Sequence, residues 1–309
     1  MKKNKFLKIA GAIFTMCLMT TCAIGTTFAK YTTGSKASDT ARVAKWGVEV
    51  SASGTMFGTA YQNTILAEGD TNATVQSNHN ASFADKVVAP GTKNDTGIQI
   101  SVKGQPEVEY MLKAEQTQAP SDIYLVKGNY GVMIAAPGIN AATDFNAEEL
   151  YTLASGTYTR ATTYSSTATY YRLTDKATVA TDFYYPIAWS AAVYVDGVCY
   201  VQNPAFATVE LALNALITGI NDYDGTTTVG YAQFDPNTAI NLVYTLTWSW
   251  AFDGNDGADT ILGNLMANTM GQTVNVVKLA NDGTYSAVTS SDYNLTVGCG
   301  FSITATQVD

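Results

Sequence analysis

The sequence predicts an all-β protein, arranged as a jelly-roll-like two-sheet sandwich with two or three short helical insertions. Hydrophobic residues make up 46% of the 309 residues and charged residues only 14%, so the chain has enough apolar material for a core while its polarity comes mainly from uncharged side chains. The short hydroxyl side chains and the 19 tyrosines suit strands with one solvent-facing side. Runs of strand-like residues are separated almost throughout by Gly, Asn, Asp or Pro.

The first strand is expected within residues 42–53, where Val48 and Val50 face one side and Glu49 the other. A turn at Ala89-Pro90-Gly91 precedes the next strand. Further strands are expected at 96–102, 107–115, 123–126, 131–135, 168–173, 191–202, 239–249, 273–279 and 293–305. No repeat of fixed period interrupts this series, so we expect one domain of about 280 residues.

Two stretches change to helical periodicity. Asn203 and Pro204 supply an N-cap and a first-turn proline for a helix over residues 205–217, and Asp259 is expected to cap a second helix. A short helical turn is expected near residues 146–151. The apolar stripes, which we expect to pack in the core, are Phe206, Val209, Leu213, Leu216 and Ile217 in the first helix and Ile261, Leu262, Leu265 and Met266 in the second.

Residues 1–29 have the pattern of a secretory signal peptide. The first eight residues contain four lysines, residues 9–29 carry no charge, and Ala29 is a small residue at the expected cleavage position. An uncleaved anchor is the alternative, because 21 uncharged residues are long enough to cross about 30 Å of hydrocarbon, although threonines weaken such a span. Cleavage leaves residues 30–309 as a secreted single domain, and it lowers the net charge from −9 to −13. Membrane contact is then expected only through the signal peptide before cleavage.

The residue inventory argues against most enzyme classes. A single histidine, His79, lies in a polar loop-like stretch, which excludes a zinc site with two histidines from one chain and leaves no credible catalytic triad. The paired carboxylates Glu107 and Glu109, and Glu148 and Glu149, lie in solvent-facing patterns. A pI near 4.6 argues against nucleic-acid binding, which needs clustered Lys and Arg. We therefore expect no enzymatic activity, no catalytic residues and no cofactor.

One acidic loop has part of the spacing of a calcium site. Asp253, Asn255 and Asp259 occupy positions 1, 3 and 7 of such a loop. Position 6, however, is Ala258 instead of Gly, and position 12 is Asn264 instead of Glu. The favoured interpretation is a tight turn that delivers Asp259 to a helix, so no metal ligands are assigned.

Four cysteines divide between the leader and the body. Cys17 and Cys22 leave with the signal peptide, and Cys22 lacks the preceding residues of a lipoprotein signal. Cys199 and Cys299 remain in strand-like runs of an exported chain. A disulfide between them and two buried thiols are both compatible with the sequence.

Three stretches together resemble the TasA/camelysin family, whose members are processed by a signal peptidase of the SipW type. The first is Thr27-Phe28-Ala29-Lys30-Tyr31 leading into residues 38–47; the second is Val88-Ala89-Pro90-Gly91-Thr92, with Thr92 where the family has Asp; the third is residues 246–260. Together they cover about a fifth of the chain. The resemblance implies a jelly roll, processing by that peptidase, and assembly into biofilm-matrix fibres by donor-strand complementation.

The expected function is therefore that of a secreted structural protein, located in the extracellular matrix or on the cell surface. Its partner is a second copy of itself, with residues 30–50 as the candidate donor strand that adds to the neighbouring subunit. The alternatives are a monomeric cell-surface binding or adhesion module and, less well supported, a camelysin-like protease. The chain has no recognisable zinc motif for the latter.

Overall fold

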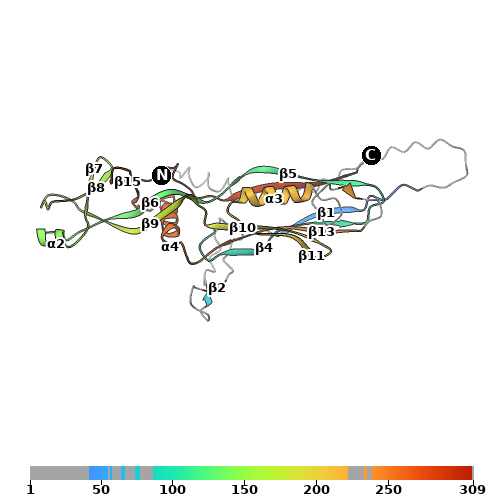
Figure 1. The fold of residues 1–309 in the computed structure, drawn as a ribbon, viewed down its shortest axis with the longest axis horizontal. Helices are drawn as coiled ribbons and strands as arrows, with labels where there is room; N and C mark the ends of the chain where they lie inside the picture. The colour runs from blue at the N-terminus through green and yellow to red at the C-terminus, as the bar shows by residue number, and fades with distance from the viewer. Residues whose placement is uncertain are drawn as a thin grey trace, which may run out of the picture.

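The computed structural model describes residues 42–54, 56–57, 64–66, 74–76, 86–221, 233–234 and 239–307. Within these residues, strands predominate, three helices are inserted between them, and the molecule is elongated along one axis (Figure 1). The protein is thus an all-β sandwich with three helical insertions, as the sequence predicted. The predicted signal peptide (residues 1–29), residues 30–41 and His79 lie outside the described residues.

One layer of the sandwich is a five-stranded antiparallel sheet that brings together distant parts of the chain. Val102, for example, is paired with Val50 on one side and with Leu242 on the other. In spatial order the strands are β1 (Val48–Gly54), β4 (Lys93–Gly104), β13 (Ile240–Trp250), β10 (Ile187–Val195) and β11 (Val198–Phe206).

The opposite layer combines a three-stranded sheet with a helix. The sheet has the order β12 (Gln233–Phe234), β5 (Tyr110–Ser121) and β17 (Gly298–Gln307). Helix α3 (Val209–Asn221) packs against β5 and β17 and also against β10, so it fills space between the two layers (Figure 1).

The predicted start of this helix was wrong. Asn203 and Pro204 belong to β11, because the pairing of β11 with β10 continues as far as Phe206. The helix begins at Val209, whose N–H donates to Asp122 Oδ1 at 2.8 Å, while the Thr208 hydroxyl accepts from the N–H of Leu211 at 3.3 Å. The pairing of β11 with β10 therefore outweighs the helix-start pattern of Asn203 and Pro204. The carboxylate of Asp122, which directly follows β5 in the sequence, accepts a hydrogen bond from the first turn of the helix instead.

The other half of the molecule contains a seven-stranded sheet that closes partly on itself. An additional pairing of β14 with β6 joins six of its strands into a ring. Each of those six strands contributes to one small, tyrosine-rich core: Met133, Tyr151, Tyr158, Tyr171, Leu173, Val277 and Tyr285. In order the strands are β14 (Val276–Leu279), β15 (Tyr285–Ala287), β8 (Thr157–Arg160), β7 (Tyr151–Ala154), β9 (Tyr171–Tyr184), β6 (Tyr124–Ala135) and β16 (Tyr293–Asn294).

Helix α4 (Asp256–Thr269) packs against β9 and β6 of this half. Asn255, not Asp259, is its N-cap residue, and Asp259 lies inside the first turn. Of the predicted stripe, Ile261, Leu262 and Leu265 are buried, but Met266 is 46% exposed and Ala258 takes a place in the core instead. The third helix, α2 (Ala142–Asn146), forms just before the predicted 146–151 turn. A two-stranded ladder of β2 (Thr64–Leu66) and β3 (Thr74–Gln76) completes the described elements.

The main core shows the predicted period-two alternation most clearly along β13. Leu242, Tyr244 and Leu246 are fully buried, whereas Val243 and Thr245 between them point to the other face and are half-buried. Trp189 of β10 is 1% exposed and belongs to the same core.

Several strand predictions were right in kind but wrong in extent. The two strands predicted at 123–126 and 131–135 are parts of the single strand β6, which begins at Tyr124, and residues 293–305 are divided between β16 and β17. The 191–202 run is divided into β10 and β11 by Asp196 and Gly197, which have φ values of 50° and 80°. Two successive positive φ angles are typical of the tight hairpin turn that favours Asp-Gly. The short strands β2, β3, β7, β8, β12 and β15 were not predicted.

Candidate functional site

An ion pair clamps the chain just before it enters the five-stranded sheet. The Arg42 guanidinium donates to both carboxylate oxygens of Glu107, at 2.5 and 2.6 Å, and the backbone N–H of Lys45 donates to Glu107 Oε2 at 2.8 Å. The Glu107 N–H in turn donates to Lys45 O at 3.0 Å. These hydrogen bonds lower the pKa of Glu107 to about 2, so this carboxylate holds the backbone and is unsuited to proton transfer at neutral pH.

The clamp fixes where the preceding segment leaves the molecule. Residues 42–47 run beside residues 105–107, with the Gln105 N–H donating to Gly47 O at 3.1 Å, and β1 begins at Val48. This point lies toward the end of the molecule opposite α2 (Figure 1). The last three residues of the candidate donor, 48–50, are already paired with β4 of the same chain.

Two sheet edges face each other across one side of the sandwich. Among the described strands, β1 pairs only with β4 and β17 pairs only with β5, and these two outer strands lie close together. Along this seam the described core is incompletely covered: Val48 and Ala305 are only partly buried although they pack against the main core. An added strand at this seam would cover apolar side chains as well as backbone groups.

Within the described part of the chain, the outer edge of β17 lacks the residues that usually protect an exposed strand edge. Natural proteins block open edges with Lys, other charges, proline or a very short strand. The ten residues of β17, Gly-Cys-Gly-Phe-Ser-Ile-Thr-Ala-Thr-Gln, contain neither a charge nor a proline. The seam formed by β1 and β17 is therefore chemically ready to accept another strand.

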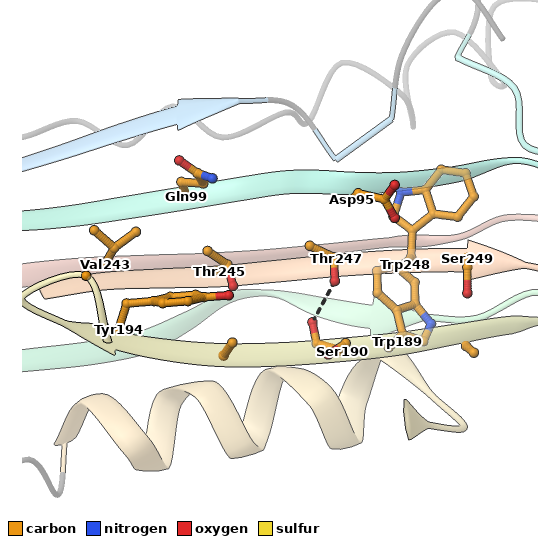
Figure 2. A pocket seen from close by; sticks show the side chains of 13 residues that line it. Asp95, Gln99, Trp189, Ser190, Tyr194, Val243, Thr245, Thr247, Trp248 and Ser249 are labelled. Atoms are coloured by element: carbon orange, nitrogen blue, oxygen red, sulfur yellow. Dashed lines mark hydrogen bonds between the residues drawn. The ribbon is translucent and has the colours of Figure 1, made fainter. Parts of the chain in front are cut away.

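A separate groove lies on the outer face of the five-stranded sheet (Figure 2). It has a volume of about 630 Å³ and crosses β4, β13 and β10. Its floor is formed by small side chains, including Ser190, Ala192 and Thr247. Larger side chains stand around them, with Gln99 on one side and Tyr194 extending along the groove beside Thr245. The sequence analysis assigned no role to this surface, and its only local signal was the run of outward-facing hydroxyls on β13.

The acidic residues of the loop before α4 do not converge on an ion site. Asp259 accepts a hydrogen bond from the Tyr184 hydroxyl at 2.7 Å, and burial raises the pKa of the Asp259 carboxyl. In the described ranges, no group of three or more His, Cys, Asp or Glu side chains is placed to hold a metal ion.

The remaining paired carboxylates lie in ion pairs. Glu148 binds the Arg172 guanidinium, and Glu149 lies 3.7 Å from Arg160 Nε and 3.6 Å from Lys176 Nζ. Although Glu148 and Glu149 are adjacent in sequence, they bind different basic residues and do not form an acid/base dyad.

The two cysteines of the body are not joined to each other. Cys199 is exposed on β11, at an edge of the five-stranded sheet, whereas Cys299 is buried on β17 in the opposite layer. The structure therefore contains no disulfide between them. It also does not contain two buried thiols, because only Cys299 is buried.

Comparison of the chain with protein-family models, curated proteins and solved structures gave no match. In the part of the chain that the structure describes, no helix is both long and apolar enough to cross a membrane. Functional inference therefore depends on the β1–β17 seam and the outer groove.

Proposed function

We propose that the chain is a secreted structural protein whose copies join head to tail into extracellular fibres of a biofilm matrix or cell surface. The observation that carries this proposal is the unprotected edge of β17 beside a line of half-buried core residues. The resemblance to the TasA/camelysin family at the signal-peptide junction supports the same function. Cleavage after Ala29 by a peptidase of the SipW type creates the free end that assembly needs.

The donor in this proposal is the segment of residues 30–41. Since residues 48–50 are used in the molecule's own sheet, the donated part is the segment that precedes the Arg42–Glu107 clamp. Twelve extended residues reach roughly 40 Å, somewhat more than the roughly 33 Å length of a ten-residue strand such as β17. The segment carries Lys30 and Lys36 against one acid, Asp39, while the body that receives it is strongly acidic. Charge therefore favours intermolecular docking of the arm.

Head-to-tail growth follows because the donor arm and the acceptor seam are different parts of the chain. The clamp holds the base of the arm toward one end of the molecule, and the arm is added to the seam of the next copy. A heterologous contact of this kind produces a filament when the repeated rotation does not close into a ring.

Deletion of the arm provides the main test. Purified residues 30–309 are compared with residues 42–309 by electron microscopy and by sedimentation. We expect fibres from the first protein and monomers from the second. A synthetic peptide of residues 30–41, added in excess, is expected to bind residues 42–309 and to stop the growth of the longer protein, because it occupies the seam.

A point substitution tests the seam itself. Ala305→Glu places a charge among the half-buried residues beside β1, and Ala154→Glu places the same charge at the exposed end of β7, far from the seam. We expect Ala305→Glu to abolish fibres and Ala154→Glu to retain them. Fibres from residues 42–309 as abundant as those from residues 30–309 would rule out donor-strand assembly.

Secretion and processing have an independent test. Mass spectrometry of the exported protein is expected to show Lys30 as the first residue. A mature chain that retains the apolar segment would contradict the proposed cleavage and leave the donor segment attached to the membrane.

A further inference from the structure

The outer groove owes its shape to the sizes of residues that pair across three strands. Thr245 of β13 is paired with Gln99 of β4 on one side and with Ala192 of β10 on the other, and Thr247 is paired with Ser190. Small residues therefore meet at the centre while longer ones stand at the margin, and a hollow results in an otherwise flat sheet face (Figure 2). Its volume of about 630 Å³ is within the ~300–1,000 Å³ typical of small-molecule sites.

The lining offers hydrogen bonds but almost no net charge. Among the described residues, no Lys, Arg or His side chain lines the groove. Its one carboxylate, Asp95, is neutralised by an ion pair with Lys93 at 2.6 Å. This neutrality contrasts with the net charge of −9 on the whole chain. Anionic ligands find no cation here, so an uncharged ligand is favoured.

Several polar side chains in the groove make no side-chain hydrogen bond within the described part of the chain. These side chains are Gln99, Tyr194, Thr245 and Ser249. They are not fully buried, so water satisfies them at little cost, and they remain available to a ligand. Together they present hydroxyl and amide groups that both donate and accept, beside the apolar surfaces of an aromatic ring, Ala192 and Val243.

We propose that this groove binds a short segment of a neutral polysaccharide. A sugar ring alternates hydroxyls that donate and accept with faces of C–H groups, and this is the pattern that the lining complements. The Tyr194 ring supplies a wall for an apolar sugar face. The hydroxyls of Thr245 and Ser249 and the amide of Gln99 supply hydrogen-bond partners. The site is distinct from the β1–β17 seam, since it lies on the outer face of the five-stranded sheet over β4, β13 and β10, whereas the seam lies at the outer edges of β1 and β17.

Calorimetric titration of the mature chain, residues 30–309, tests the proposal with defined probes. The neutral probes are cellohexaose, maltohexaose and chitohexaose, and the anionic probe is hexagalacturonate. We expect saturable binding of at least one neutral hexasaccharide and none of hexagalacturonate. Thr245→Val, which keeps the shape but removes a hydroxyl, is expected to weaken binding roughly threefold, and Tyr194→Ala about tenfold.

Ser101→Ala is the matched control, because Ser101 lies on β4 of the same sheet but does not line the groove. It is expected to leave the affinity unchanged, and thermal unfolding shows that each variant is folded. Absence of binding by all three neutral probes overturns the proposal, as does equal loss of affinity in Ser101→Ala and Thr245→Val. Self-association that depends on Tyr194, without sugar binding, would instead identify the groove as a contact between copies.

Discussion

The side chain of Asn221 pairs with strand β5 much as a neighbouring strand would. Its Oδ1 accepts from the Ala114 N–H at 2.7 Å, and its Nδ2 donates to Ala114 O at 3.1 Å, across 107 residues of sequence. Asn221 ends helix α3, so this amide ties the helix into the second layer of the sandwich. Ala114 is only 2% exposed, which limits the access of water to the two backbone groups.

Asn221→Ala removes both hydrogen bonds. Leaving one buried backbone group without its partner costs about 1–3 kcal/mol, so two groups with partial access to water give an expected loss of about 2–4 kcal/mol. At the usual size dependence of about 2–4 °C per kcal/mol, the melting temperature falls by roughly 4–16 °C. Equilibrium urea unfolding, followed by circular dichroism at neutral pH, measures the loss directly.

Asn268 provides a matched comparison within the same chain. Its Nδ2 donates to Val274 O at 2.6 Å and its Oδ1 accepts from the Val274 N–H at 2.7 Å, but these partners are only six residues apart. Because Val274 is half-buried and the closed loop is local, we expect Asn268→Ala to cost about 1–2 kcal/mol. Equal costs for the two variants, or a cost under about 1 kcal/mol for Asn221→Ala, would show that water replaces the amide and would refute the reasoning.

Three further substitutions test the sheet packing and the buried charges. Gly97→Ala is expected to cost more than about 3 kcal/mol, because φ is +52° and an added Cβ would lie 1.9 Å from Leu246 O; wild-type stability in urea would contradict this close approach. The pKa of Asp292 lies below its usual value: burial raises it, but the hydrogen bonds, chiefly from Lys278, lower it by more. The contribution of Asp292 to stability is therefore present at neutral pH and is lost as the pH falls. Asp292→Asn is therefore expected to be less stable at pH 7 and to lose less stability on acidification. Burial raises the pKa of Asp259, so its contribution to stability is present at acid pH and is lost as the pH rises. Asp259→Asn is therefore expected to be at least as stable as the parent at pH 7. Urea titrations at several pH values measure this, and a large loss of stability at pH 7 would show the sign to be wrong.

The sequence predicted the sandwich class because its signal is local and repeated. Along β13, apolar and polar residues alternate over eleven residues, and burial follows that alternation at nearly every position. The stripe of α4 was likewise correct at Ile261, Leu262 and Leu265, since its spacing at helical period fixes a shared face. Patterns of this kind identify which side of an element is buried but not which element covers it.

The errors arose where distant pairing decided the outcome. Asn203 and Pro204 resemble a helix start, yet their backbone is recruited by β10 through the Asp196-Gly197 hairpin. The real cap of α3 comes partly from Asp122, 87 residues away from Val209, which no local pattern indicates.

The outer groove depends equally on the register between strands. The outward hydroxyls of Thr245 and Thr247 are visible in the sequence, but a hollow forms only because Ala192 and Ser190 lie opposite them on β10. One residue of slippage in that register would turn every side chain of the strand to the other face. A binding surface of this type therefore becomes visible only when the pairing is known.

The groove and the edge of β17 lie on different layers, and this separation has a consequence for avidity. Strand addition at β17 extends the three-stranded layer at its edge, whereas the groove opens on the outer face of the five-stranded layer. Fibre growth then leaves each groove accessible, and every subunit adds one more binding site along the filament. Linked sites convert later binding events on a long polymer into intramolecular ones, so fibres are expected to bind a long neutral polysaccharide more tightly than residues 42–309 do. A hexasaccharide too short to bridge subunits is expected to bind fibres and monomers equally. Cosedimentation of both forms with long and short glucans tests this expectation. If assembly covered the groove, fibres would bind the long glucan no more tightly than monomers do.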